Sequence, residues 1–507
     1  MYFVDLLPNW KIRMHLEQFK PFFDFVINWY WVPLLILYAG IISAILIENR
    51  NPTKTVAWIL VIVFLPFVGI ILYYFFGQKF VKVKKLKRLN REQALRLEQK
   101  WKELDPIIES FIRDIKDDIG GLSKVFRLMK KERLSSPALN NDVELLINGE
   151  VKFRYLLEDL AQAKHSIHME YYIFEMDTIG TKILDLLEEK AAEGVVVRLI
   201  VDSFGSPDLV KYMRRQKESK IDFHAFLPVT FTSLANSNYR NHRKICVIDG
   251  RVGYVGGINI SDRYINDSQS AKKLYWRDTS VRVKGLAINL LQVSFWNSWN
   301  QTDGKSFYLE DGYLQALRDN KEVKGNASVG FISSDPASLG PYNMEALLIA
   351  IGEANHKIQL CTPYYIPGEE LERALIIAAS SGVEVELMVP KASDSILVHH
   401  ASYSFLKPLL ERGVKVYLYK KGFLHAKTAV FDEKLSFIGT VNLDIRSFYI
   451  NYEIATVISD PVLSRDLSHQ FEIDKQESEL LTLRAWKKRP RWQRAADSAC
   501  RLLAPLL

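Results

Sequence analysis

Two stretches of this sequence resemble each other: HRKICVIDGRVGYVGGIN at 242–259 and HAKTAVFDEKLSFIGTVN at 425–442. Both begin with His-x-Lys, carry an aspartate five positions after the lysine, and end in a Gly-x-x-Asn corner. Because side chains alternate along a strand, the histidine and the lysine share one face and can reach the same phosphate. A single His-x-Lys is usually structural, but the whole pattern occurring twice indicates a catalytic site built from two halves.

The chain repeats itself around these motifs. HSIHMEYYIF at 165–174 resembles HKIQLCTPYYIP at 356–367. Each of these β-rich runs is followed by a helical pattern and then by an apolar strand. Strand, helix and strand in that order favour right-handed βαβ units and mixed sheets flanked by helices.

The helical patterns span 179–193 in the first half and 369–381 in the second, and a glycine follows each of them. Glycine is the residue that most often ends a helix, so these boundaries are expected to be real. We therefore predict an α/β fold with two pseudo-two-fold halves, at 136–325 and 326–482.

The motifs supply six candidate catalytic residues: His242, Lys244, Asp249, His425, Lys427 and Asp432. Imidazole suits proton transfer and nucleophilic attack because its pKa lies near neutrality, and lysines stabilise developing negative charge. The corners add Asn259 and Asn442 as candidate substrate-binding residues, since an amide can donate to a phosphoryl oxygen. Asp249 and Asp432 fall at the turn and are expected to brace their motifs rather than to contact substrate.

The two halves differ at one motif position. Gly257 in the first half is matched by Thr440 in the second, whose hydroxyl adds a donor to one half only. The flanks agree better, because Arg263 and Arg446 each lie four residues after the motif asparagine. Both halves are therefore expected to supply a guanidinium.

A pair of tyrosines recurs in the two halves, close to the strand that precedes each helical pattern. The residues concerned are Glu170 with Tyr171 and Tyr172, and Tyr364 with Tyr365. They either line a headgroup pocket or pack in the core, and the sequence favours neither interpretation.

Two apolar runs stand near the N-terminus, at 25–47 and 56–76. Each is long enough for a membrane-spanning helix, which takes about 20 apolar residues. Aromatic residues at their edges suit the interfacial belt of a bilayer. The short connection between them predicts a transmembrane hairpin over 25–76, rather than a signal peptide or a buried core hairpin.

Charge around these runs predicts the orientation. Seven lysines and arginines and no acidic residue lie between Gly77 and Arg91, directly after the second run. The positive-inside rule places that side, and hence the catalytic halves, in the cytoplasm. The segment 77–135 is expected to be a basic helical linker, and 1–24 is a basic and apolar segment for which an in-plane helix is one interpretation.

The C-terminal segment 483–507 carries seven basic residues against one acid, interleaved with tryptophan and leucine. This pattern is typical of an amphipathic helix that lies in the membrane interface. A helix that simply caps the globular part fits the pattern equally well.

The overall charge is positive, with 67 lysines and arginines against 59 acids and a formal net charge of +8. Such a balance indicates an anionic partner, either nucleic acid or anionic lipid. The chain has three cysteines without the spacing of metal ligands: Cys246, Cys361 and Cys500. They are expected to be reduced thiols.

The paired patterns resemble the HKD motifs of the phospholipase D superfamily. The apolar N-terminal runs, the WRD segment at 276–278 and the basic, Trp-rich tail are similar to the bacterial cardiolipin synthases within it. The likeness covers nearly the whole chain, and the motif pair is its most specific part. It implies a bacterial cell membrane location, with phosphatidylglycerol and other anionic phospholipids as partners and no nucleic acid.

The resemblance implies a transferase that moves a phosphatidyl group from one phosphatidylglycerol to another, releasing glycerol and yielding cardiolipin. One histidine attacks phosphorus to give a phosphohistidine, and the other serves the departing and incoming alcohols as acid and base. By similarity His242 is the nucleophile and His425 the general acid. No metal and no other cofactor is expected, because two lysines and two asparagines would surround the phosphoryl oxygens.

The family also keeps an acid after each motif, at places that Asp278 and Glu453 occupy here. Each is expected to orient one of the two histidines, including the histidine of the opposite half. The alternative for Asp278 is a salt bridge with Arg277 or Arg282.

Other activities are compatible with the same catalytic residues. A phospholipase D-type hydrolase would admit water in place of the alcohol, and another phosphatidyltransferase would take a nucleotide-activated donor and serine. A nuclease fits the charge, but the hairpin and the tail would deliver the site to lipid. Two complete motifs argue against an inactive scaffold. The sequence leaves open the second lipid, phosphatidylglycerol or phosphatidylethanolamine, as well as acyl-chain preference and oligomeric state.

Overall fold

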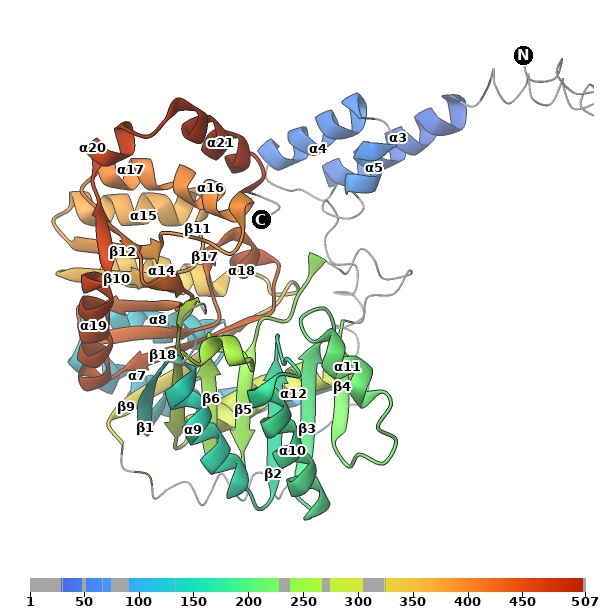
Figure 1. Cartoon of the computed structure of the whole chain (residues 1–507), viewed down its shortest axis with the longest axis vertical. Coiled ribbons are helices and arrows are strands. Elements are labelled where there is room, and N and C mark those ends of the chain that lie inside the picture. Colours follow the sequence, from blue (N-terminus) through green and yellow to red (C-terminus); the bar gives the residue numbers. More distant parts are fainter. Residues whose placement is uncertain are drawn as a thin grey trace, which may run out of the picture. The chain divides into compact units, whose positions relative to one another are not determined.

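The computed structural model describes residues 29, 31–47, 52–65, 67–73, 91–132, 134–227, 238–266, 274–303, 323 and 325–504 of the 507-residue chain. It divides into two units, Met1–Lys79 and Phe80–Leu507. The predicted in-plane segment 1–24 and the basic residues of 77–90 lie outside the described residues. Figure 1 labels the elements along the chain.

The helices described in the N-terminal unit are α3 (Trp31–Ile47), α4 (Pro52–Phe64) and α5 (Val68–Leu72). The second predicted helix is thus divided in two beside Pro66, a residue that removes a helical hydrogen bond. Ile45, Ile62 and Tyr73 form a small core between the helices. None of the helices described combines the length and the apolarity that a bilayer crossing takes.

The larger unit begins with a helical segment and then runs through the two halves. The segment comprises α7 (Arg91–Ile119), the short 3₁₀ helix η3 (Gly120–Ser123) and α8 (Lys124–Lys131). The first half comprises β1 (Ala138–Ile147), α9 (Asn148–Ala161), β2 (Ser166–Tyr171), α10 (Thr178–Ala192), β3 (Val196–Asp202), α11 (Pro207–Met213), β4 (Asp222–Phe226), β5 (Lys244–Ile248), β6 (Val252–Gly256), η5 (Asp262–Tyr264), β7 (Tyr275–Arg277), β8 (Thr279–Lys284) and α12 (Ala287–Asp303).

The second half follows the same plan and adds the C-terminal helices. It comprises β9 (Ala327–Ser334), α14 (Tyr342–Glu353), β10 (Lys357–Cys361), β11 (Tyr365–Ile366), α15 (Gly368–Ser380), β12 (Glu384–Pro390), α16 (Ile396–Ser404), α17 (Leu406–Glu411), β13 (Lys415–Tyr419), β14 (Gly422–Leu424), β15 (Thr428–Phe431), β16 (Leu435–Gly439), β17 (Leu443–Asp444), α18 (Ile445–Tyr449), β18 (Glu453–Ser459), α19 (Pro461–Gln476), β19 (Ser478–Leu481), α20 (Leu483–Lys487) and α21 (Arg491–Arg501).

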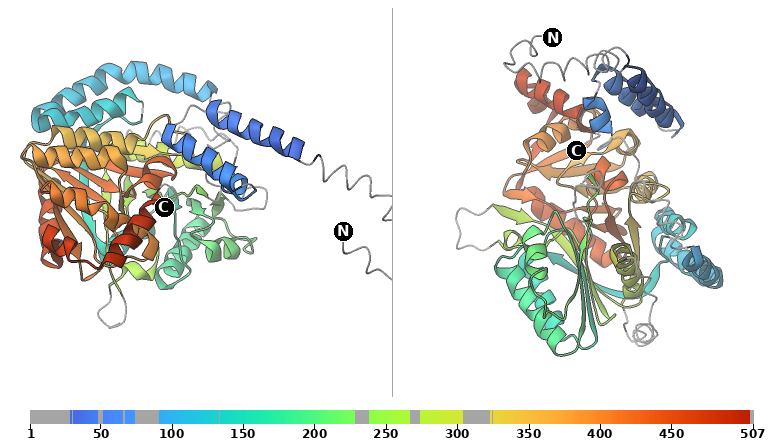
Figure 2. Two further views of the ribbon diagram at one scale, coloured as in Figure 1. Left: turned by 90° about the horizontal axis from the view of Figure 1, so that it is seen from above. Right: turned by 90° about the vertical axis from the view of Figure 1, so that its right-hand side faces the viewer.

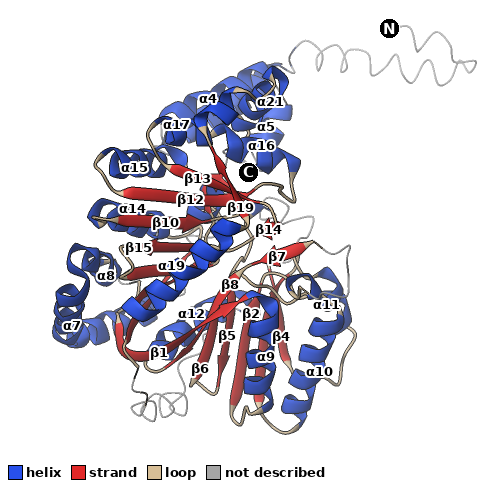
Figure 3. Cartoon of the chain, turned by 60° about the vertical axis from the view of Figure 1, so that its left-hand side comes forward, coloured by secondary structure: helices blue, strands red, loops and turns tan. Residues whose placement is uncertain are grey.

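The main strands form one 15-stranded mixed sheet, in the order β19-β13-β12-β10-β15-β16-β18-β9-β1-β8-β6-β5-β2-β3-β4. The antiparallel pair β1–β9 lies at its centre. Outward from this pair, the first half runs β8, β6, β5, β2, β3, β4 and the second runs β18, β16, β15, β10, β12, β13. Each of these strands of one half therefore has a counterpart in the other, and β19 adds one further strand at the edge of the second half. Figure 3 shows the two runs of strands.

The predicted βαβ units are present in both halves. β2 and β3 pair in parallel across α10, and β10 and β12 do so across α15. The glycines that follow these helices, Gly194 and Gly382, both have φ of 97°. A residue with a side chain rarely adopts this conformation, which explains why the helices end there.

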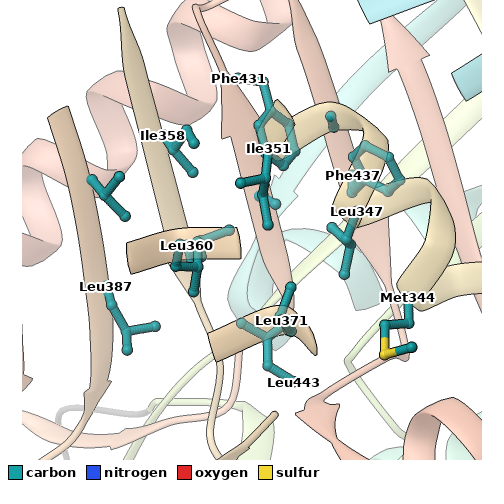
Figure 4. Close-up of a cluster of buried hydrophobic side chains, with 14 of the residues drawn as sticks. Met344, Leu347, Ile351, Ile358, Leu360, Leu371, Leu387, Phe431, Phe437 and Leu443 are labelled. Carbon is teal, nitrogen blue, oxygen red and sulfur yellow. The ribbon is translucent and has the colours of Figure 1, made fainter. Parts of the chain in front are cut away.

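Helices cover the outer faces of both half-sheets, and the inner faces meet in a shared core. The shared core joins Val255 and Val283 of the first half to Ile438 and Ile454 of the second, together with residues of α12 and α19. In the outer core of the second half, α14 and α15 pack on β10, β12, β15 and β16 (Figure 4). Apolar burial of this extent holds the two halves together as one body.

The segment predicted as a linker is helical, but part of it belongs to the catalytic unit. Ile108, Ile112, Ile115 and Ile119 recur every three or four residues on α7 and are buried in the same core as α14. This spacing places them on one face of the helix. Figure 2 (left) shows α7 and α8, in light blue and cyan, lying along the yellow to orange helices of the second half. The segment is therefore more than a spacer.

Candidate active site

Both motif histidines lie just before the first strand of a hairpin. His242 precedes β5 and His425 precedes β15, and each hairpin returns to a Gly-x-x-Asn corner through β6 or β16. The strand residues that follow the lysines are buried, so the hairpins are anchored in the core. This anchoring gives the histidines a rigid base.

The motif aspartates occupy the opposite ends of these strands. Asp249 accepts hydrogen bonds from the backbone N–H groups of Lys164, His165 and Ser166 at 2.7–2.8 Å. Asp432 accepts three corresponding bonds, from residues 355–357. Both have φ of 52°, as the two-residue hairpin turn requires. Each aspartate lies five positions along the extended chain from its lysine, about 16 Å away, so these carboxylates brace the hairpins and lie away from the histidines.

The two halves exchange backbone hydrogen bonds at the histidines. The N–H of His242 donates to the carbonyl of Tyr452 at 2.9 Å, and the N–H of His425 donates to that of Arg277 at 2.7 Å. β14 and β7 pair in parallel beside the second of these bonds. Because Glu453 follows Tyr452 and Asp278 follows Arg277, the exchange carries each acid to the histidine of the opposite half.

Each histidine therefore contacts one buried carboxylate. His425 Nδ1 lies 2.6 Å from Asp278 Oδ2, and His242 Nδ1 lies 3.2 Å from Glu453 Oε1. Both acids are fully buried. Burial alone would raise their pKa values, but the histidines and the motif lysines outweigh it and lower both. Ionised carboxylates at Nδ1 leave Nε2 of each ring for chemistry.

The alternative partners of Asp278 are engaged elsewhere. Arg277 pairs with Asp474 at 2.8 Å, and Arg282 pairs with Asp159 and Glu144 at 2.7 Å. A simple salt bridge between Asp278 and either arginine is therefore the wrong interpretation.

The motif lysines bring buried positive charge to the site. Lys244 and Lys427 each donate from Nζ to the carbonyl of the histidine two residues earlier. Burial lowers the pKa of Lys244 to about 8 and that of Lys427 to about 7. A buried ammonium group is stabilised more strongly by a neighbouring anion than a solvated one is, so the two lysines suit a phosphate group.

The two histidines differ in their surroundings. Burial, followed by the charge of Lys427, lowers the pKa of His425 to about 4, although Asp278 opposes the shift. Lys244 acts on His425 in the same direction, so the charged groups of both motifs share one site. The side chain of His425 is 14% exposed and that of His242 is 24% exposed. Burial and the neighbouring lysines therefore favour a neutral His425.

The corner asparagines hold the backbone near the site. Asn259 accepts from the N–H of Ile173 at 3.2 Å and donates to the hydroxyl of Tyr264 at 2.8 Å. Asn442 is 5% exposed, and its Oδ1 has no hydrogen-bond partner among the described residues. The arginines that follow are paired within the protein, Arg263 with Glu175 and Arg446 with Asn238.

The glycine–threonine difference has a steric cause. A Cβ at Gly257 would meet Asp278 Oδ1 at 2.2 Å, so the first half has no room for a side chain. In the second half, Thr440 instead donates its hydroxyl to Glu453. The longer glutamate accepts this extra donor, whereas the shorter aspartate occupies the corresponding space itself.

The tyrosine pairs divide between core and site. Tyr171, Tyr365 and Glu170 are fully buried, as the core interpretation expects. The ring of Tyr172 lies 4.3 Å from that of His242, and Tyr364 donates to Asp394 at 2.8 Å. Tyr172 and Tyr364 are therefore the tyrosines that lie at the site.

Several residues around the histidines were missed by the motif analysis. Asn451 Nδ2 lies 3.3 Å from His242 Nδ1. Near the other histidine, the hydroxyl of Tyr264 lies 3.4 Å from His425 Nδ1, and the ring centroids of Trp276 and His425 are 5.4 Å apart. Asn451 stands two residues before Glu453, as Trp276 stands two before Asp278, and this shared offset is the signal that could have found them.

A buried lysine outside the motifs, Lys152 of α9, supports the first half. Its Nζ donates to the carbonyl of Ile258 at 2.6 Å, and burial lowers its pKa to about 7. Its charge interacts favourably with Asp278 and unfavourably with Lys244. This hydrogen bond holds the Gly-x-x-Asn corner in place. The sequence feature that could have predicted this role is a lysine on the otherwise apolar face of a helix.

This arrangement can carry out a two-step displacement at phosphorus. Two imidazoles, each oriented by a buried carboxylate, can act as nucleophile and as acid and base, while two lysines hold the anion. The described residues include no group of three or more His, Cys, Asp or Glu side chains placed to hold a metal ion.

Comparisons with known proteins identify close relatives of the chain. A family model described as "Cardiolipin synthase, PLD-like domain" matches residues 156–273 and 347–475, and one described as "Phospholipase_D-nuclease N-terminal" matches 34–78. The chain is 36% identical to cardiolipin synthase of Alkalihalophilus pseudofirmus, over 94% of this chain and 92% of the relative. It is 33% identical to the major cardiolipin synthase ClsA of Bacillus subtilis, over 93% and 98%.

A solved structure of lower identity shares the fold. Phosphatidylserine synthase from Haemophilus influenzae Rd KW20 matches with a TM-score of 0.57 and 16% identity, over 76% of this chain and 100% of that one. At this identity the match bears on the fold alone. It agrees with the mixed α/β architecture described above.

Proposed function

The chain belongs to the cardiolipin synthase family of the phospholipase D superfamily, and from this premise we propose that it joins two phosphatidylglycerol molecules through a phosphohistidine. It is a phosphatidyltransferase, as its relatives are. The observation that carries the proposed mechanism is the crossed contact of His242 with Glu453 and of His425 with Asp278. Such contacts orient both rings for one phosphorus.

In the first step, Nε2 of His242 attacks the phosphorus of the donor phosphatidylglycerol. The bond from phosphorus to the headgroup glycerol oxygen breaks, and His425 transfers a proton to that oxygen. Glycerol leaves, and the phosphatidyl group remains on His242. Lys244 and Lys427 stabilise the charge that develops on the phosphoryl oxygens.

In the second step, His425 removes the proton from the terminal hydroxyl of a second phosphatidylglycerol. The resulting oxygen nucleophile attacks the phosphohistidine, the phosphorus–nitrogen bond breaks, and cardiolipin is formed. In the empty site the pKa of His425 is lowered by burial and by the lysines. A bound phosphodiester opposes the lysines and so favours the protonated ring that the first step needs.

The direct test uses purified full-length protein with phosphatidylglycerol vesicles labelled in the headgroup glycerol. Cardiolipin and free glycerol in equal amounts are the expected products. Phosphatidic acid as the main product would instead indicate hydrolysis. Adding phosphatidylethanolamine to the vesicles tests it as the second lipid substrate. If it donates its phosphatidyl group to phosphatidylglycerol, ethanolamine is released in place of glycerol and the lipid product is still cardiolipin.

The order of the two histidines is tested by trapping the intermediate. A phosphatidyl ester with a p-nitrophenol leaving group needs no protonation to depart, so His425→Ala should still form a labelled adduct that cannot turn over. His242→Ala should form none. The measurement is radiolabel on acid-labile, base-stable protein after quenching. The reverse pattern would make His425 the nucleophile, an assignment that its low pKa in the empty site also suits.

We expect a decline in kcat/KM as the pH rises from 7 to 9. The pKa of Lys427 is about 7 and that of Lys244 is about 8 in the empty site, so both lose their charge across this range. The phosphodiester stays anionic over this range, but the lysines no longer attract it once they have lost their protons. The decline should reach at least about tenfold. Lys427→Arg keeps a charge throughout and should flatten the profile, and a profile unchanged by that substitution would contradict the explanation.

We propose further that 25–76 forms a transmembrane hairpin with the catalytic unit on the cytoplasmic side. The proposal is supported by the exposed apolar side chains of the N-terminal unit, such as Ile36 at 66%, Ile47 at 82% and Phe64 at 76%. The basic run that follows the second apolar segment gives the orientation.

Cysteine labelling tests this topology. The native cysteines are buried, so an impermeant maleimide should label intact spheroplasts of Asn51→Cys, in the connection, and not of Lys116→Cys, on α7. Labelling of Lys116→Cys alone would reverse the orientation. Equal labelling of both would contradict the hairpin.

A further inference from the structure

The C-terminal helix α21 has an outer face that is both apolar and basic. Its inner face, with Asp497 and Cys500, is buried. Side chains three or four residues apart form an exposed apolar stripe: Trp492, Ala495, Ala499, Leu502 and Leu503. Trp492 is 66% exposed and Leu502 is 82% exposed. The two sequence interpretations of this segment are thus compatible, since one face caps the protein and the other faces outward.

Helix α16 extends this apolar stripe. His400 lies 2.7 Å from Asp497, and Arg501 donates to the carbonyl of Ser404, so α16 and α21 run side by side in the same direction. Their adjacent positions are visible in Figures 1 and 3. In this register, Ile396 and Leu397 lie at the same end as Trp492. They are 78% and 51% exposed, although both begin a helix that is otherwise packed.

Basic side chains border the apolar stripe. Arg491 and Arg494 lie next to it on α21, and Lys487 and Lys488 lie at the C-terminal end of α20, all of them exposed. Tryptophan and leucine with flanking arginine and lysine suit the interface of a bilayer with anionic headgroups. A protein partner with an acidic rim would also match the charge, but the substrate of this family is itself an anionic lipid.

The same surface adjoins the active site. Asp394 stands two residues before Ile396, at most about 7 Å along the chain. It accepts a hydrogen bond from Tyr364, and its charge acts on Lys427, opposing the effect of burial on that lysine's pKa. The loop before α16 therefore joins the rim of the catalytic site to the exposed ends of the two helices.

We propose that the lipid-facing surface, formed by Ile396 and Leu397 of α16, Trp492 of α21, and Leu502 and Leu503 directly after α21, rests on an anionic bilayer beside the active-site rim. In this orientation a phosphatidylglycerol headgroup reaches Lys427 past Asp394 without the lipid leaving the membrane. The surface goes beyond the N-terminal anchor, because it sets the orientation of the catalytic unit rather than its attachment.

The test compares two presentations of the same substrate with the full-length protein. Trp492→Glu and Leu397→Glu are assayed on phosphatidylglycerol vesicles and on phosphatidylglycerol dissolved in non-ionic detergent micelles. Turnover on vesicles should fall at least tenfold, while turnover in micelles should stay within twofold of the unmodified protein. Val462→Glu on α19, where the valine is 56% exposed, is the matched control and should change neither.

Each other outcome would overturn the proposal. Unchanged turnover on vesicles would show that the surface does not meet the bilayer. An equal fall in vesicles and micelles would assign these residues to the fold or the chemistry. A change in molecular mass by light scattering, with vesicle turnover retained, would mean that a second copy covers the surface. The micelle activity of the unmodified protein tests the transfer reaction separately, so failure of that reaction is distinguishable.

Discussion

His242→Ala and His425→Ala are each expected to lower cardiolipin formation at least about 10⁴-fold. Each substitution removes a group that bonds to phosphorus or carries a proton in both steps, and such groups act as a unit. The measurement is the initial rate of cardiolipin formation from labelled phosphatidylglycerol. The double variant should be hardly slower than either single one, because each single change already stops the sequence of steps.

The matched control for both is His469→Ala, an exposed histidine on α19. It should leave the rate within twofold, and all variants should keep the melting temperature of the unmodified protein within a few degrees. Substantial turnover in either motif variant would rule out a mechanism in which both histidines are required.

Asp278→Asn and Glu453→Gln are expected to lower kcat by about 10²–10⁴-fold with little change in KM. An amide keeps the shape of the acid but can present a donor to Nδ1, which turns the imidazole to the wrong tautomer. The loss should be greater for Asp278, whose contact with His425 is 2.6 Å, than for Glu453, whose contact with His242 is 3.2 Å. Substrate binding should survive because the lysines are unchanged.

The pH profile separates orientation from a merely structural role. Losing the carboxylate at Asp278 should lower the pKa of His425 further. The alkaline limb of the kcat profile, where the general acid of the first step loses its proton, should then move to lower pH, which a local packing defect would not cause. Asp474→Asn is the comparison, because it disturbs the ion pair of the neighbouring Arg277 without contacting a histidine. Equal effects of Asp474→Asn and Asp278→Asn on the profile would contradict the role given to Asp278.

The repeated motifs were enough to predict the architecture of the catalytic unit. The helices predicted at 179–193 and 369–381 are found at Thr178–Ala192 and Gly368–Ser380. These boundaries are local properties, set by apolar periodicity and by a glycine that can adopt positive φ. The motif turns could be predicted for the same reason, since Asp249 and Asp432 lie where each hairpin reverses direction.

Features that depend on distant packing were harder to predict. The segment 77–135 reads as a linker because its basic and acidic residues are conspicuous, yet the isoleucines of α7 are buried against α14. The second apolar run was predicted as one helix and is divided into α4 and α5. For α7 the deciding contacts lie outside the window that a local pattern covers, whereas the division between α4 and α5 is a local effect of Pro66.

By itself, the sequence determined the residues on which the proposed chemistry rests: the histidines and lysines of the motif, its occurrence twice, and the two acids that accompany it. Only the tertiary structure decided which acid serves which histidine. His242 and Glu453 are 211 positions apart, and two backbone bonds between the halves bring them together, from the N–H of His242 to the carbonyl of Tyr452 and from the N–H of Tyr452 to the carbonyl of Arg240. Spacing along the chain gives information only on residues that are near in sequence. The pairing of each histidine with the acid of the other half is set by the packing of the two half-sheets against each other.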